Sequence, residues 1–145
     1  MDNKNYFEST CTYSLHRAEY FFALIVTAYF ILANWQAINW WHFIILFSYI
    51  DLIGYIPGSI AYRLSDDKKI GKIFYVLYNC MHSLITAGVV AGLWCLFIGL
   101  EWALLALSIH LFGDRAIFGN FLKPFSVSFE PIAHPAYKRF MKEIE

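Results

Sequence analysis

Four long apolar segments, separated by polar or aromatic stretches, dominate the chain. They cover approximately residues 15–35, 40–62, 72–94 and 101–122. Each holds about 20 residues, enough for an α-helix to cross a hydrocarbon core of about 30 Å. The pattern therefore predicts an all-α fold. We expect residues 1–145 to form one integral membrane domain, built as a four-helix bundle.

Local signals mark the ends of these spans. Residues 34–39 form a polar and aromatic turn typical of a membrane interface, and residues 63–69 form a charged loop. Pro57 removes a helix hydrogen bond and predicts a kink in the second span, or the end of its regular part. Pro124 predicts the end of the fourth span. The join at residues 95–100 is itself apolar, so the break near Gly99 has the weakest signal.

The distribution of basic residues predicts an orientation. Residues 1–14 form a polar lead-in, and residues 123–145 form an amphipathic tail. Lysine and arginine occur before the first span, between the second and third, and after the fourth, but not in the two other joins. By the positive-inside rule, both termini, the middle loop and the tail lie in the cytoplasm. We expect a multi-pass protein of a bacterial-type inner membrane.

Composition agrees with a membrane protein and excludes some partners. The chain is 59% hydrophobic and only 15% charged, whereas soluble domains carry about 25% charged residues. The net charge of zero offers no basic surface for nucleic acid. Cys11, Cys80 and Cys95 show no metal-ligand spacing, so we expect free thiols. Two glycine pairs, Gly54 with Gly58 and Gly88 with Gly92, predict close helix packing.

Costly polar residues interrupt the apolar spans at matching depth. Asp51, His82 and His110 each lie about ten residues into a span, roughly 15 Å from either surface. Asp114 and Glu19 lie closer to the cytoplasmic side. Helical periodicity places Tyr55 on the face of Asp51, and Tyr75 and Asn79 on the face of His82. Because ionisable groups in a membrane normally face the bundle interior, one shared site is predicted.

Two interpretations of this site stay open. His110 and Asp114, four residues apart, are consistent with a structural hydrogen-bonded pair. Together with Asp51 and His82 they are also suited to acid–base catalysis, or to holding a divalent metal such as zinc, iron or manganese. We therefore name Asp51, His82, His110 and Asp114 as catalytic residues and metal ligands.

Five residues around this core are expected to bind the substrate: Tyr55, Tyr75, Asn79, Arg115 and Glu19. Asn79 is expected to act as a polar bridge, and Arg115 either pairs with Asp114 or binds an anionic head group. Tyr55 and Tyr75 are expected to donate hydrogen bonds in the cavity. His16 and Glu19 are expected to form an interfacial pair that borders the substrate. His42 and His134 are given no role in the site.

The order of these residues resembles a family of small bacterial four-span membrane proteins of uncharacterised function. Its pattern, Asp…GY, YNxxHS and HxxxDR, is matched by Asp51 with Gly54-Tyr55, by Tyr78 to Ser83, and by His110 to Arg115. The resemblance covers about residues 48–121. It implies the fold and strengthens the choice of site, and it implies no reaction.

The leading hypothesis is a membrane enzyme that acts on a lipophilic substrate by metal-assisted chemistry. The first alternative is a metal-free isomerase or cyclase, with Asp51 or Asp114 as the acid and a histidine as its partner. The second is a non-enzymatic subunit or a proton-conducting oligomer. The expected partners are the lipid bilayer, a lipophilic small molecule and, in the last case, further copies of the chain.

Overall fold

The protein is all-helical, as predicted. The computed structural model describes residues 9–144, so the first part of the expected lead-in lies outside the described residues. Helix makes up 75% of the structure, and no strand occurs in the described range. The elements are α1 (Thr10–Ala33), η1 (Trp35–Ala37), α2 (Trp40–Gly54), α3 (Ile56–Leu64), α4 (Lys72–Met81), α5 (Leu84–Phe97), η2 (Trp102–Leu104), α6 (Leu105–Gly113), η3 (Asp114–Phe118) and α7 (Pro135–Ile144).

Two of the helical segments are long and apolar enough to cross a membrane. They are α1, with 24 residues, and α2 continued by α3, with 25 residues. The pair α4 and α5 also qualifies if it is counted as one span, bent by 58° at its break. The segment from η2 to η3 is shorter and does not qualify. The structure therefore supports two or three spans, and the count of four stays a prediction.

The third apolar segment is not one continuous helix from residue 72 to 94, as the sequence predicted. α4 ends at Met81, and α5 begins at Leu84 and continues to Phe97. The cause is local, because the Ser83 side chain accepts a hydrogen bond from the backbone N–H of Ile85 (3.2 Å) and so caps a new helix. His82 lies at this break.

The fourth apolar segment ends earlier than predicted. Its helical part stops at Phe118, several residues before Pro124, because Gly119 adopts a left-handed conformation with φ of 66°. The side chains of α1 hold this end in place. The Tyr13 hydroxyl donates to the Gly119 carbonyl (3.0 Å), and Arg17 donates twice to the carbonyl of Ala116.

The glycine pair of the second segment allows close packing. A Cβ on Gly54 would lie 2.8 Å from Met81 Cβ and 3.1 Å from the His82 ring, and one on Gly58 would overlap the Phe129 ring. The same expectation for Gly88 and Gly92 is wrong, because a Cβ on either would meet nothing within 4 Å. The break expected near Pro57 is present, since α2 ends at Gly54 and α3 begins at Ile56.

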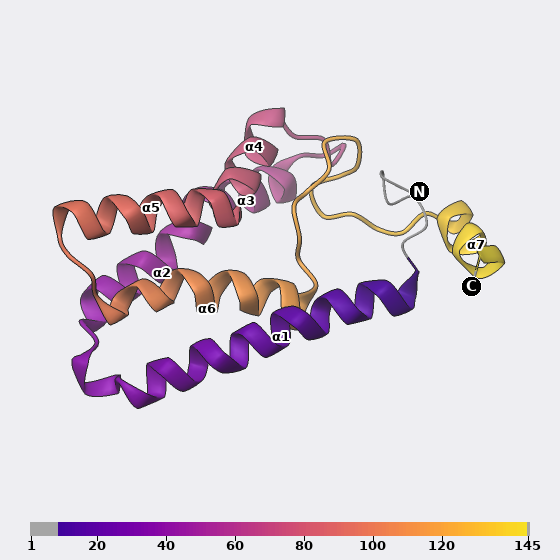
Figure 1. Ribbon diagram of the computed structural model, residues 1–145. Helices are drawn as coiled ribbons and strands as arrows, with labels where there is room; N and C mark the ends of the chain where they lie inside the picture. The colour runs from indigo at the N-terminus through magenta and orange to yellow at the C-terminus, as the bar shows by residue number, and fades with distance from the viewer. Residues whose placement is uncertain (1–8, 145) are drawn as a thin grey trace.

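The buried core lies between α2, α5 and α6 and is small. It is formed by Leu46, Ile50, Ala87, Ala103, Ala106, Leu107 and Leu111. Figure 1 shows α6 between α5 and α1, with α3 and α4 at one end of the molecule and α7 beside the start of α1. Large apolar side chains cover the outer surface, for example Leu32 (70% exposed) and Phe97 (84% exposed). Apolar surface on this scale is typical of a protein that contacts lipid.

Candidate metal centre

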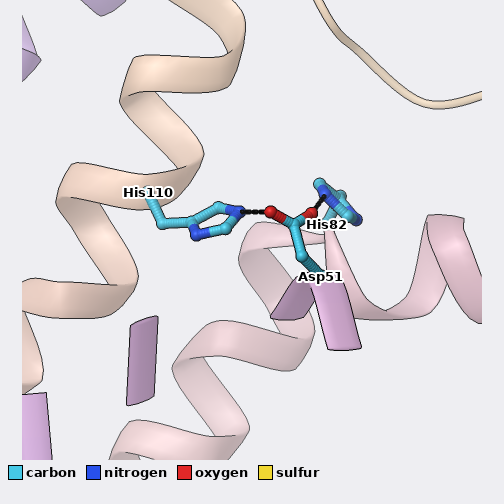
Figure 2. Close-up of side chains that lie close together, drawn as sticks. All are labelled: Asp51, His82 and His110. Atoms are coloured by element: carbon cyan, nitrogen blue, oxygen red, sulfur yellow. Dashed lines mark ion pairs between the residues drawn. The ribbon is translucent and has the colours of Figure 1, made fainter. Parts of the chain in front are cut away.

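The structure brings together four of the predicted site residues from separate elements. Asp51 comes from α2, His82 from the end of α4, His110 from α6, and Asp114 from the first position of η3. His82 Nε2 lies 3.4 Å from Asp51 Oδ1 and 3.3 Å from Asp114 Oδ2. His110 Nε2 lies 3.7 Å from Asp51 Oδ2 and 3.6 Å from Asp114 Oδ2. Figure 2 shows Asp51 between the two imidazoles.

The backbone fixes the orientation of His82. Its Nδ1–H donates to the carbonyl of Tyr78 (3.0 Å), and its ring stacks on the Tyr78 ring with a centroid distance of 4.0 Å. With Nδ1 engaged in this way, Nε2 is the ring nitrogen that faces the two carboxylates. Histidines that bind metals are commonly oriented in this way, by a hydrogen bond from the other ring nitrogen.

His110 is buried and poorly satisfied. Its side chain is 4% exposed. Neither ring nitrogen meets the geometry of a hydrogen bond, although the Phe47 backbone is close enough to act as a weak partner. A buried polar atom without a partner is costly and calls for an explanation. The two nearby carboxylates are too distant to satisfy His110 Nε2 directly, but they are well placed to share a cation with it.

The spacing of the donor atoms suits a metal ion. Bonds of about 2.0–2.2 Å to zinc place neighbouring ligands of a tetrahedron about 3.3–3.6 Å apart. The distances from Asp51 to His82 and to His110, 3.4 and 3.7 Å, lie close to this range. One donor atom from each of Asp51, His82 and His110 lies within 4.8 Å of the others. These three residues could therefore hold a metal ion.

Asp114 stands apart from this group of three, although its Oδ2 is close to both imidazoles. It is not part of the group whose donor atoms all lie within 4.8 Å of one another, and it begins η3, a π-helical turn of five residues. Such turns occur often at functional sites, because they re-aim a side chain within a helix. Asp114 is thus placed beside the metal-holding group, within reach of a molecule bound there.

A pocket of about 230 Å³ opens next to these residues. Asp51, Tyr55, His82 and Asp114 line it, as do several residues that the sequence analysis did not select, namely Tyr78, Phe118, Asn120, Lys123 and Glu130. Three carboxylates thus share the pocket with a single lysine and the His82 imidazole. This excess of negative charge favours a bound cation.

Lys123 is the main residue that the sequence analysis missed. Its Nζ donates to the carbonyl of Phe129 (2.6 Å), lies 3.7 Å from Glu130 Oε1, and sits 4.7 Å from the centre of the Tyr78 ring. Burial lowers the pKa of the Lys123 ammonium from its usual value, and Glu130 acts against that shift. No helical periodicity signalled this residue, because it lies in the extended chain after Gly119.

Asn79 and Arg115 do not line the pocket but bind the backbone of residues that do. Asn79 receives a hydrogen bond from the backbone N–H of Lys123 (2.7 Å) and donates one to its carbonyl (2.9 Å), which matches the expected polar bridge. Among the described residues Arg115 forms no ion pair with Asp114, and its binding of a head group stays a prediction. Its buried guanidinium donates to the Tyr20 hydroxyl (2.7 Å) and to the His82 carbonyl (3.3 Å). Arg115 therefore holds the backbone of His82.

The other predicted residues divide between the pocket and the outside. Tyr55 lines the pocket, but Tyr75 turns away and donates to the carbonyl of Val127 (2.9 Å). Glu19 is exposed on α1, and among residues 9–144 it forms no ion pair with His16 or with the site. Helical spacing could not reveal this, because it does not tell which face of α1 meets α6.

A second cluster of histidine and carboxylate lies away from the pocket. His42 Nδ1 is 2.7 Å from Glu101 Oε2, and the Trp94 indole N–H donates to the same oxygen at 3.4 Å. Both side chains are close to 30% exposed. The sequence analysis assigned His42 no role in the site, and the structure gives it a partner that lies far along the chain.

Comparisons with models of protein families, with curated proteins and with solved structures found no match to this chain.

Proposed function

We propose that this protein is an integral membrane enzyme that acts on a lipophilic substrate with the help of a divalent metal ion. Asp51, His82 and His110 hold the ion, and the pocket beside them receives the reacting group. The observation that carries this proposal is His110, a buried imidazole whose Nε2 has no hydrogen-bond partner and lies 3.6 to 3.7 Å from two carboxylates. A cation held by Asp51, His82 and His110 would satisfy that nitrogen and the Asp51 carboxylate together.

The donor set indicates the kind of metal. Two imidazoles and one carboxylate with an open position are typical of catalytic zinc, and the same set suits iron(II). Such an ion supplies an activated water molecule or a polarised substrate oxygen. Asp114 is placed to accept a proton beside it. Tyr55 and Lys123, on the pocket wall, are placed to orient the polar group of a substrate.

The membrane arrangement is part of the same proposal. The chain crosses the inner membrane four times, with both termini in the cytoplasm. The helical segment from Trp102 to Phe118 is about 25 Å long at the rise of an α-helix. It can still cross, because a bilayer thins locally around a short span at modest cost. A substrate that dissolves in the bilayer reaches such a site from the lipid.

One observation favours a metal-free alternative. His82 Nε2 lies 3.3 to 3.4 Å from two carboxylates, near enough for a protonated imidazole to bridge them without an ion. In that arrangement His82 and a carboxylate would exchange a proton with the substrate, as in an isomerase or a cyclase. His110 has no comparable partner in this alternative, which is why we place it second.

Elemental analysis of the purified protein separates the two functions. His82→Ala and His110→Ala are compared with wild type and with His42→Ala, which removes an imidazole outside the site. We expect about one metal ion per chain in wild type and in His42→Ala, and a loss of most of it in the other two. A wild-type protein without metal would refute the metal centre and leave acid–base catalysis. Equal metal in all four proteins would place the ion elsewhere.

A further inference from the structure

An apolar groove runs between α5 and the segment that contains α6. Its volume is about 300 Å³, and it is lined on one side by Leu84, Ala87, Gly88 and Ala91. The opposite wall comes from Leu104, Leu105, Leu107, Ser108 and Leu111, among which Ser108 is the one polar side chain. Figure 1 shows α5 and α6 side by side along this length. The groove is therefore a site for hydrocarbon.

Missing side-chain volume on α5 creates the groove. Ala87 is the only buried residue of this helix. A Cβ on Gly88 would meet nothing within 4 Å, so glycine here leaves space that a neighbouring helix does not use. Protein interiors normally fill such space to the density of an organic crystal. In a bilayer, lipid is available to fill it.

The groove begins at the level of the metal centre. Leu84 follows His82 by two residues, and Leu111 follows His110 directly. From Leu84 to Ala91 the groove extends about 10 Å along α5, at 1.5 Å per residue. A molecule lying in it would therefore have one end near the two histidines and the other about 10 Å farther along α5, toward Ala91.

We propose that this groove binds a single acyl or isoprenoid chain of the substrate and presents its polar group to Asp51, His82 and His110. The inference rests on the proposed function and names the class of substrate, a lipid with a hydrocarbon chain attached close to the reacting group. The pocket of about 230 Å³ holds that group, and the groove of about 300 Å³ holds the start of the chain.

The size of the groove favours a chain over a second protein. Ligand cavities in proteins begin at about 300 Å³, so this one suits a slender ligand. A stable protein interface needs about 20 to 30 residues on each side, whereas the groove spans two turns of α5. Docking of a helix from a second copy, which is about 10 Å wide, would require α5 and α6 to separate.

Photo-crosslinking tests the groove directly. The probe is a phospholipid with a diazirine in one acyl chain, mixed into nanodiscs that contain wild type or a variant. Gly88→Trp places an indole that leans toward Leu84 and fills the groove. Ile85→Trp is the matched control, because Ile85 is 80% exposed on the outer face of α5. Crosslinked peptides are then located by mass spectrometry.

We expect crosslinks on the groove residues in wild type and in Ile85→Trp, and about tenfold fewer in Gly88→Trp. Crosslinks on the exposed face of α1, around Phe22, should be equal in all three. Groove crosslinks that Gly88→Trp leaves unchanged, or that are absent in wild type, would overturn the proposal, as would crosslinks there to a second copy of the chain. If Gly88→Trp does not fold, Gly88→Leu serves, with a smaller loss expected.

Metal content measured on the same samples separates this inference from the proposed function. Gly88→Trp should keep its metal while it loses the groove crosslinks. His110→Ala should lose its metal while it keeps them. A protein with metal but no lipid in the groove contradicts only the present inference. Lipid in the groove of a protein that binds no metal contradicts only the metal-assisted function.

Discussion

Two clusters in this molecule pair histidine with carboxylate, and they differ in almost every physical respect. In the first, Asp51, His82, His110 and Asp114 place nitrogen and oxygen 3.3 to 3.7 Å apart, and both imidazoles are about 95% buried. In the second, His42 and Glu101 approach to 2.7 Å and are about 30% exposed. The two clusters are separated by about 13 Å along α2, which carries His42 and Asp51.

In the second cluster the polar groups are satisfied within the protein, whereas the first cluster leaves a buried nitrogen without a partner. Glu101 is satisfied twice, by His42 and by the indole of Trp94, and partial exposure lets water satisfy the rest. His110 Nε2 has no hydrogen-bond partner, and burial keeps water from supplying one. The same residue types thus form a satisfied hydrogen-bonded pair in one place and a group that could hold a metal ion in the other. The two clusters are told apart by the distances between their atoms, by their burial and by whether each polar atom has a hydrogen-bond partner.

The largest effect is expected when the negative charge of Asp51 is removed. Asp51→Asn keeps the shape of a side chain that faces both imidazoles but removes its negative charge. We expect the affinity for metal to fall at least about a hundredfold, because even residues behind the ligands cost 10- to 100-fold. Competition with a fluorescent chelator measures it. An affinity within threefold of wild type would show that Asp51 is not a ligand.

A smaller effect is expected from a methyl group that displaces a ligand. In Gly54→Ala the new Cβ would lie 2.8 Å from Met81 Cβ and 3.1 Å from the His82 ring. We expect about a tenfold weaker metal affinity and a free energy of unfolding lower by about 1–3 kcal/mol. Titration with metal and chemical denaturation measure the two quantities.

Gly88→Ala is the control for that experiment, because a Cβ there meets nothing within 4 Å. It should bind metal as wild type does, and it should be no less stable, since alanine favours helix over glycine. Equal effects of the two substitutions would show that Gly54 matters through helix propensity and not through its contact with His82.

The smallest effect is expected in the second cluster. Glu101→Gln removes the ion pair with His42 but keeps an oxygen for Trp94. Because both side chains are partly exposed, we expect a loss of about 0.5–1 kcal/mol in the free energy of unfolding and no change in metal content. Denaturant unfolding and elemental analysis check this. A loss of metal in this variant would remove the distinction between the two clusters.

Much of the site was predictable because depth and periodicity can be read from the sequence. Asp51, His82 and His110 stand out as polar residues near the middle of apolar segments, and residues in the middle of packed helices meet. The all-helical fold followed from the length and apolar character of the segments.

The features that could not be predicted from the sequence depend on breaks in the helices and on extended chain outside them. The start of α5 has a local signal, the capping Ser83, and the end of η3 has another, the pair Gly119-Asn120. The apolar residues around both sites nevertheless favoured longer helices. Lys123 enters the pocket from extended chain, whose path has no periodicity. Glu19 and Arg115 were misplaced because spacing gives a face of a helix, not the partner that the face meets.

The most direct test of the central claim is X-ray absorption spectroscopy of the metal in the purified protein. The account predicts about one ion per chain, ligated by nitrogen and oxygen at about 2.0–2.2 Å, with the multiple scattering of two imidazoles. His110→Ala should reduce this to one imidazole or remove the ion, and His42→Ala should leave the spectrum unchanged. A sphere of thiolate sulfur, or two imidazoles that persist in His110→Ala, would contradict the metal centre at Asp51, His82 and His110.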